Sequence, residues 1–350
     1  MKFYIGLVYG LQIGAAVADI CSKNQSLTRV DELLRIKNCT NLKGALIFSF
    51  RDPVSIVLSR LKEAHDLTIH GAGVTEVKFD GLRSVGRLSV VDTSGLTLIR
   101  MPRLKKADFL SVENARSLHF LEFRSGLDIV GDLTLKNTSL QAIQDIHAKV
   151  IASIVLENNP NLLKMPLPYL QKVNRAFIVK APNEKFVLNA PALEEVFGGV
   201  TYERGGRIEM PKLHIIHGNL RLLRLNAIGI DLPVKQVKGS LEVIDCHNLI
   251  LLTLPRLVRV EGWLYIFRDY ALESIRLRSL ESIGGNIHVY ALNAYDIHLN
   301  RLLTGPKKTT IVAKVICTRI YKVFGPQLKS LTCVSSATAY ESSGMFLSLF

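Results

Sequence analysis

The stretch from His217 to Val289 repeats one short pattern four times, and this repeat predicts the fold. Each copy is a glycine followed by alternating apolar and polar residues: His217-Gly218-Asn219-Leu220-Arg221-Leu222, Lys238-Gly239-Ser240-Leu241-Glu242-Val243, Glu261-Gly262-Trp263-Leu264-Tyr265-Ile266 and Gly284-Gly285-Asn286-Ile287-His288-Val289. Consecutive glycines are separated by 21, 23 and 23 residues. Such a period, with a turn before a short strand, is typical of a solenoid built from stacked coils.

A proline marks a second position in the repeat. Leu252-Thr253-Leu254-Pro255-Arg256-Leu257 lies between two of the glycines, and Ile208-Glu209-Met210-Pro211-Lys212-Leu213 precedes the first of them. A proline just after a strand costs few ladder hydrogen bonds. We expect the glycine to supply the backbone freedom that a tight corner needs. Coils stacked ~4.8 Å apart can pair their backbones and enclose a continuous apolar core.

The same pattern continues, more loosely, toward the N-terminus. Gly44, Gly86 and Gly131 each precede an apolar strand, at separations of 42 and 45 residues that are near doubles of the period. Proline- or serine-rich linkers are missing from this part of the sequence. We therefore predict an all-β fold in which one continuous solenoid spans residues 41–333, with roughly a dozen coils.

Residues 1–18 have the features of a secretory signal peptide. Lys2 precedes an apolar run that ends in Ala16-Val17-Ala18, which matches the basic start, apolar middle and small-residue cleavage site of such a peptide. The alternative is an uncleaved anchor, for which the run is short. We interpret the protein as secreted.

Secretion makes disulfides the expected state of the cysteines. Cys21 and Cys39 bracket Leu27–Ile36, whose apolar spacing predicts a short helix. Residues 19–40 would then form a disulfide-tied cap over the first coil. Cys317 and Cys333 could act in the same way at the far end, although the pairing stays open. Cys246 is left over, and we interpret it as a buried structural thiol.

Three sequons and the C-terminal residues carry the remaining signals of a surface protein. Asn24, Asn38 and Asn137 each begin an Asn-x-Ser/Thr triplet and are predicted glycosylation sites. Residues 334–350 turn from small and polar to apolar. This tail resembles a short lipid-anchor (GPI) signal, and the alternative is a disordered terminus.

The formal net charge of +14 points to anionic partners. The basic residues are spread along the chain without a concentrated patch, so we predict no nucleic-acid site. Anionic wall glycans or other surface proteins are the predicted partners, with Arg221, Arg224, Arg276 and Arg278 as contacts suggested by strand alternation. The alternative is that these cations simply occupy outward-facing strand positions.

No arrangement of residues predicts catalysis, a metal or a cofactor. His214 and His217 need not converge, and the neighbours Glu194 and Glu195 point apart rather than forming an acid and base pair. A β-helical enzyme that acts on polysaccharides would place acidic residues at one repeat position in adjacent coils. Leucine, isoleucine and valine dominate those strands instead.

The start of the repeat resembles a known family. Cys21, the segment Asn38-Cys39-Thr40-Asn41-Leu42-Lys43-Gly44-Ala45-Leu46-Ile47 and the ladder of proline and glycine turns are similar to fungal cell-surface glycoproteins built on receptor L-domain repeats. This family includes GPI-anchored wall-organisation and sporulation-specific proteins. The resemblance covers about residues 20–333 and implies a right-handed parallel β-helix at the cell surface or wall.

The predicted function is therefore that of a non-catalytic secreted or surface-attached glycoprotein that contributes to cell-wall or spore-wall organisation. A receptor-like ligand-binding ectodomain is the first alternative. A polysaccharide-acting β-helical enzyme is the second.

Overall fold

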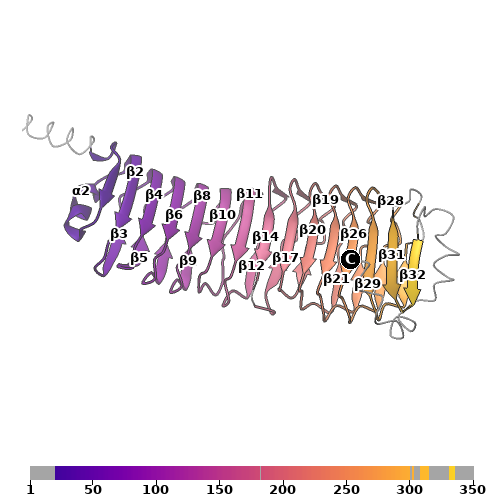
Figure 1. Ribbon diagram of the computed structural model, residues 1–350. Coiled ribbons are helices and arrows are strands. Elements are labelled where there is room, and N and C mark those ends of the chain that lie inside the picture. Colours follow the sequence, from indigo (N-terminus) through magenta and orange to yellow (C-terminus); the bar gives the residue numbers. More distant parts are fainter. Residues whose placement is uncertain (1–19, 182, 300–301, 303–307, 315–330, 336–350) are drawn as a thin grey trace, which may run out of the picture. The chain divides into compact units, whose positions relative to one another are not determined.

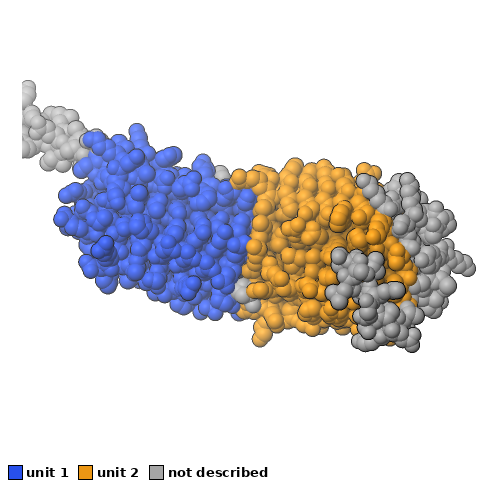
Figure 2. All heavy atoms as spheres, viewed as in Figure 1, with its two compact units in different colours: residues 1–167 blue, residues 168–350 orange. Residues whose placement is uncertain are grey.

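The computed structural model describes residues 20–181, 183–299, 302, 308–314 and 331–335. The chain divides into two compact units, residues 1–167 and 168–350 (Figure 2). In both units short parallel strands are stacked from coil to coil, as Figure 1 shows, with about 13 turns in all. The predicted signal peptide and residues 336–350 of the predicted tail lie outside the described residues.

The first unit contains two parallel sheets. The main sheet consists of β1 (Gln25–Leu27), β2 (Asn41–Ser49), β4 (Glu63–His70), β6 (Ser84–Val91), β8 (Lys106–Glu113), β10 (Ile129–Lys136) and β11 (Val150–Glu157), paired in this order. The second sheet consists of β3 (Val54–Val57), β5 (Val74–Lys78), β7 (Leu98–Arg100) and β9 (Phe120–Glu122). β12 (Lys164–Pro166) also lies in this unit.

The N-terminal cap differs in part from the prediction. Helical structure covers only η1 (Val30–Glu32) and α2 (Leu33–Ile36), because Gln25–Leu27 forms the strand β1 and pairs with β2. Of the apolar residues that predicted the helix, Leu27 is buried and Leu33 is half-buried, whereas Val30 and Leu34 are exposed. A disulfide joins Cys21 to Cys39, so it links the two ends of the cap.

The second unit repeats a coil with shorter strands. Its main strands are β14 (Phe177–Lys180), β17 (Val200–Glu203), β20 (Leu220–Leu223), β23 (Leu241–Ile244), β26 (Leu264–Phe267), β29 (Ile287–Ala291), β31 (Thr309–Ala313) and β32 (Leu331–Ser335). A row of two-residue strands precedes them: β13 (Lys172–Val173), β16 (Glu195–Val196), β19 (Ile215–Ile216), β22 (Gln236–Val237), β25 (Arg259–Val260) and β28 (Ser282–Ile283). Further strands are β15 (Val187–Asn189), β18 (Ile208–Glu209), β21 (Gly229–Asp231), β24 (Leu251–Thr253), β27 (Ser274–Arg276) and β30 (Asp296–His298).

Stacked aliphatic side chains form the core of this unit. Leu222 pairs with Val243, Val243 with Ile266, and Ile266 with Val289, in register from β20 to β29. Each of these side chains is at most 2% exposed. Full burial of such a side chain stabilises the fold by about 1.5–3 kcal/mol. The predictions of an all-β parallel solenoid and a short N-terminal helix are confirmed.

The repeated glycines are required for a different reason from the one predicted. None of Gly218, Gly239, Gly262 and Gly285 has a positive φ angle. Each instead donates its N–H to a glycine of the preceding coil, so the backbones approach closely there. An added Cβ at Gly218 would lie 2.6 Å from the nitrogen of Gly199. These positions therefore exclude a side chain through contact between coils.

Pro255 and Pro211 lie just after a short strand, as predicted, with one residue between the strand and the proline. Pro255 follows β24, and the turn around it closes with a hydrogen bond from Leu257 N to Leu254 O of 3.2 Å. The equivalent turn around Pro211 closes from Leu213 N to Met210 O, also at 3.2 Å. Proline's fixed φ suits the second position of such a turn, and its missing N–H is not needed there.

Candidate functional site: a polar groove in the second unit

One corner of the second unit has an unusual backbone conformation. Arg204, Arg224, Asp245 and Arg268 each follow the end of a main strand and have φ angles of 64°, 51°, 58° and 58°. Each donates its backbone N–H to the next coil, for example Arg224 N to Ile244 O at 2.8 Å. The left-handed conformation costs roughly 1–2 kcal/mol for a residue with a Cβ, and arginine has no special tolerance for it.

The same corner of the first unit is built from residues that suit this conformation. Asp92, Asn114, Asn137 and Asn158 have φ angles between 52° and 58°. Their side chains form a ladder: Asn114 Nδ2 donates to Asp92 Oδ1 at 2.8 Å, Asn137 Nδ2 to Asn114 Oδ1 at 2.6 Å, and Asn158 Nδ2 to Asn137 Oδ1 at 2.6 Å. Asparagine and aspartate visit the left-handed region readily, so this ladder is explained by structure alone.

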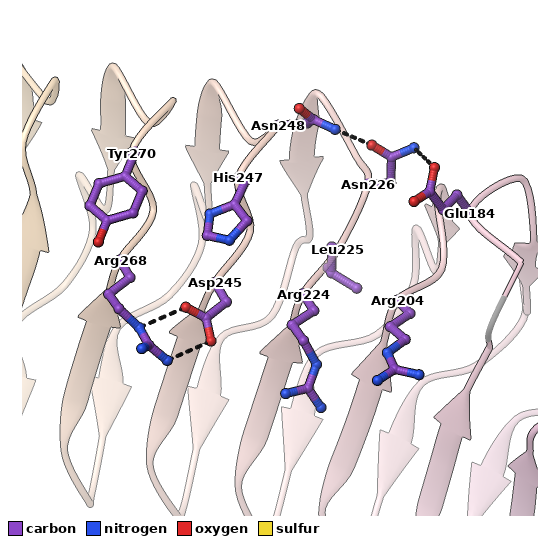
Figure 3. A pocket seen from close by; sticks show the side chains of 10 residues that line it. All are labelled: Glu184, Arg204, Arg224, Leu225, Asn226, Asp245, His247, Asn248, Arg268 and Tyr270. Carbon is purple, nitrogen blue, oxygen red and sulfur yellow. Dashed lines mark hydrogen bonds and ion pairs between the residues drawn. The ribbon is translucent and has the colours of Figure 1, made fainter.

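The arginines of the second unit are held by carboxylates. Arg268 forms a two-pronged pair with Asp245, with Nε–Oδ1 and Nη2–Oδ2 distances of 2.8 Å each (Figure 3). Arg224 and Arg204 both contact Glu203 Oε1, at 2.5 Å and 3.6 Å. Glu203 is only 8% exposed, whereas the guanidinium groups remain about half exposed. The arginines are therefore fixed in place and still accessible.

These residues line a groove of about 590 Å³. Figure 3 shows two rows of side chains across consecutive coils. One row is charged, and it contains the four corner residues. The other consists of two rings, two amides and one carboxylate: Tyr270, His247, Asn248, Asn226 and Glu184. We call this set of residues, together with Leu225, the corner groove.

The second row of the corner groove is internally bonded. Asn226 Nδ2 donates to Glu184 Oε2 at 2.9 Å, and Asn248 Nδ2 donates to Asn226 Oδ1. The rings of His247 and Tyr270 are stacked, with centroids 5.8 Å apart and planes 5° from parallel. Tyr270 remains 42% exposed, so the groove offers an accessible aromatic ring beside fixed polar groups.

Two buried side chains lie directly behind the charged row. Cys246 and Asp269 are fully buried, and Cys246 N donates to Asp269 Oδ1 at 2.6 Å. Burial raises the pKa of the Cys246 thiol to about 12, so it is protonated at neutral pH and is not a nucleophile. Burial also raises the pKa of the Asp269 carboxyl to about 7. The interpretation of Cys246 as a buried structural thiol agrees with this geometry.

The arginines suggested by strand alternation lie in different places. Arg221 is on β20 and pairs across coils with Glu242 at 3.1 Å. Arg224 belongs to the corner groove. Arg276 is on β27, paired with Asp296 at 3.5 Å, and Arg278 is exposed beyond that strand. Alternation therefore grouped residues from two faces, and only Arg224 reaches the groove.

A periodic signal in the sequence identifies the rest of the charged row. Arg204, Arg224, Asp245 and Arg268 are separated by 20, 21 and 23 residues, which is the same period as the glycines. Apolar residues and turns defined the predicted repeat, so the polar residues that recur at this corner were not predicted as a group. Asn226, His247 and Tyr270 each stand two residues after a member of this row and recur at the same separations of 21 and 23 residues, but their residue types differ, so the pattern was not recognised.

The histidines form separate contacts. His217 Nε2 lies 2.8 Å from Glu195 Oε1 and its ring stacks on Phe197, whereas His214 Nδ1 contacts Lys212 O. The hydrogen bond with His217 lowers the pKa of Glu195. Across the described residues, no group of three or more histidine, cysteine or acidic side chains could hold a metal ion. In the same part of the chain, no helix is long and apolar enough to cross a bilayer.

The three sequon asparagines differ in accessibility. Asn24 is exposed and accepts from Ala45 N at 2.8 Å through Oδ1. Asn38 is exposed and accepts from Arg60 Nη1 at 3.2 Å, also through Oδ1. Asn137 is half-buried, and its Nδ2 donates into the ladder. Glycans are attached to Nδ2 of asparagine, and among these contacts only that of Asn137 uses this atom.

The remaining predicted disulfide cysteines lie near the C-terminus. Cys333, in β32, is disulfide-bonded. Cys317 lies outside the described residues. The structure therefore places one disulfide in the cap and a second bonded cysteine in the last described strand.

The fold and the groove together define a class: a parallel β-solenoid with a polar, aromatic-containing groove at one corner. Three fungal proteins are similar to the chain. "Cell surface GPI-anchored protein" of Arthroderma benhamiae is 22% identical over 79% of this chain and 72% of its own length. "Sporulation-specific protein 22" of Saccharomyces cerevisiae is 23% identical over 80% and 62%. "Protein ecm33" of Aspergillus fumigatus is 22% identical over 73% and 67%.

The chain is related over most of its length to this family of fungal cell-surface and wall proteins, so the resemblance seen in its sequence is confirmed. The aligned region spans only about three fifths to seven tenths of the relatives' own lengths. No family model matches the chain. No solved structure matches it either. The names of the relatives agree with the predicted location at the cell surface or wall and contain no enzymatic term.

Proposed function

We propose that this protein is a non-catalytic glycoprotein of the fungal cell surface or wall, and that it contributes to wall organisation by binding through the outside of its solenoid. The relationship to surface and sporulation proteins over most of the chain carries this proposal. A GPI anchor at the C-terminus is part of the proposal, following the name of one relative.

The chemistry of the corner groove supports a binding role. The carboxylates of Asp245 and the neighbouring Glu203 are committed to arginines, and Asp269, the second carboxylate near Asp245, is fully buried behind the row. The buried thiol of Cys246 is protonated at neutral pH. These residues hold one another in fixed positions, which is what a recognition surface needs.

A receptor-like ectodomain is the second candidate function. Both candidates use a groove on the solenoid, but they differ in the occupant, which is a wall polymer in one case and a protein ligand in the other. The half-exposed arginines and the exposed Tyr270 do not decide between a wall polymer and a protein ligand, because arginine and tyrosine are also common at protein interfaces.

The test is to delete the protein from its native cells and to locate a tagged copy in the parent strain. We expect the tagged protein in the wall and plasma-membrane fractions, and we expect deleted cells to become sensitive to dyes and enzymes that attack the wall. A tagged protein confined to the cell interior, or a deletion with an unaltered wall, would contradict the proposal.

A further inference from the structure

We propose that the corner groove binds a neutral polysaccharide chain, which lies across consecutive coils and stacks one sugar ring on Tyr270. This inference rests on the proposed wall function and deepens it by naming the ligand class. Four features of the groove favour such a ligand: its balanced charges, its donors and acceptors, its exposed ring and its strained backbone.

The charges of the groove cancel in spite of the basic chain. Arg204, Arg224 and Arg268 line the groove together with the carboxylates of Glu184 and Asp245. The buried carboxylate of Glu203, which contacts Arg204 and Arg224, brings the number of carboxylates to three. The chain as a whole has a net charge of +14, so this balance is local to the corner. An anion would meet arginines whose charge the carboxylates already balance, whereas a neutral polar ligand needs no net charge.

The groove presents many hydrogen-bonding groups in fixed directions. A guanidinium has five N–H donors and a carboxylate about four acceptor sites. The pair between Arg268 and Asp245 uses two donors and two acceptor sites, and both residues line the groove. Asn226 and Asn248 add amide groups along the other row. Sugar hydroxyls both donate and accept, so a mixed row of this kind suits them.

The aromatic ring supplies an apolar contact for the face of a sugar. Tyr270 is stacked on His247 at 5.8 Å, which fixes its orientation. Its other surface is accessible, since the residue is 42% exposed. Pyranose rings have a C–H face that packs on aromatic rings, and a pre-positioned tyrosine binds with a small loss of side-chain entropy.

The backbone of the charged row supports a functional role. Three arginines occupy left-handed positions for which the first unit uses asparagine and aspartate. Residues with a strained backbone are concentrated at functional sites. Here asparagine or aspartate would fit the same conformation with less strain. The coils repeat at a spacing of about 4.8 Å, so the rows present similar groups at regular intervals, as an extended repeating polymer requires.

Binding should be measured by calorimetry on the full mature protein secreted from an expression host. The probes are a soluble neutral β-glucan, a soluble chitin oligosaccharide and an anionic polygalacturonate, each at about 50 mM and about 500 mM salt. We expect binding of at least one neutral glycan, with an affinity that changes less than about threefold between the two salt concentrations.

Variants then locate the site. Tyr270→Ala should weaken neutral-glycan binding about tenfold, and Tyr270→Phe should retain it because the ring remains. Tyr295→Ala is the matched control: Tyr295 is also exposed, at 61%, but it contacts Glu273 away from the groove. Its removal should leave binding unchanged. Unfolding temperatures of all three variants establish that each one is folded.

Three results would overturn the inference. They are no binding of either neutral glycan, equal losses for Tyr270→Ala and Tyr295→Ala, or binding of polygalacturonate alone that disappears at high salt. The last result would identify an anion site driven by charge. A protein found in the wall that gives any of these results would leave the proposed function standing, so the two proposals fail separately.

Discussion

At Gly262 the spacing between coils leaves no room for a side chain. An added Cβ would lie 2.8 Å from both the carbonyl carbon of Gly239 and the nitrogen of Ser240. We expect Gly262→Ala to lower the free energy of unfolding by about 1–3 kcal/mol, as other overpacking changes do. The measurement is urea-induced unfolding of the variant beside the unchanged protein.

Gly229 is the matched control for this change. A Cβ at Gly229 would meet its nearest neighbour, Leu251 O, at 3.7 Å. Its φ angle is not positive, so Gly229→Ala should be neutral or stabilise by up to about 1 kcal/mol. Equal destabilisation by both variants would show that contact between coils is not the reason for the glycines.

Asp269 should make stability depend on pH. Its carboxyl has a pKa raised by burial from 3.8 to about 7, so the folded protein binds the proton more tightly than the unfolded chain. This stabilisation is fully present below pH 3.8 and is lost as pH rises through about 7. Between pH 4 and pH 8 the loss is up to roughly 4 kcal/mol.

Unfolding curves at several pH values check this expectation. Asp269→Asn should flatten the dependence over that interval, whereas Asp231→Asn, a change at an exposed carboxyl, should preserve it. If the Asp269→Asn variant kept the full slope, the dependence would have to come from other groups.

At the scale of elements, the asparagine ladder of the first unit allows the stability contributed by its hydrogen bonds to be separated from the cost of its left-handed backbone. Asn114 joins Asp92 and Asn137 through side-chain hydrogen bonds, and its φ angle is 58°. Asn114→Gly removes the hydrogen bonds but tolerates the backbone, so we expect a loss of about 1–2 kcal/mol. Asn114→Ala should cost at least about 1 kcal/mol more. Equal losses in thermal unfolding would mean that the left-handed backbone contributes no cost.

The N-terminal cap is a second element with a definite prediction. The disulfide between Cys21 and Cys39 closes a sequence separation of 18, for which loop closure predicts a stabilisation of about 3 kcal/mol. A Cys21→Ser, Cys39→Ser variant should fray the cap and speed amide hydrogen exchange in β1 and the start of β2. Exchange in β23 should stay slow, and equally slow exchange in β1 would show that the cap holds without the disulfide.

Much of the architecture could be predicted because the spacing of the repeated residues gives the length of one coil. The strands after Gly218, Gly239 and Gly262 lie where the pattern placed them, since alternating apolar residues had one consistent face to bury. The helix predicted over Leu27–Ile36 is shorter than expected, partly because Leu27 belongs to the strand Gln25–Leu27, which pairs with β2. Over so short a segment, tertiary pairing outweighs local periodicity.

The candidate site was far less predictable. Arg224 was identified, but Asn226, His247 and Tyr270 were missed because they share a repeat position without sharing a residue type. Their proximity depends on the register between coils, which sets the row in which each side chain lies. The left-handed backbone conformation of the arginines could not be predicted from the sequence either, because arginine has no preference for it.

At the scale of the whole molecule, the positive charge is distributed among local pairs. In the described residues, basic side chains on the sheets meet carboxylates of neighbouring coils, as in the pairs Lys136–Glu157 at 3.5 Å and Arg221–Glu242 at 3.1 Å. Exposed pairs of this kind contribute about 0–1 kcal/mol each. The outward-facing positions thus account for many cations, and the net excess adds a general attraction to anionic surfaces.

The intact mass of the protein isolated from its native cells tests the central claim, a surface glycoprotein of the fungal wall, most directly. The mass is measured before and after enzymatic deglycosylation and after reduction. We predict the loss of residues 1–18, a glycan mass carried on exposed Asn24 or Asn38 rather than on Asn137, and disulfides that include Cys21–Cys39. A full-length, unglycosylated and fully reduced chain recovered from the cell interior would contradict the account.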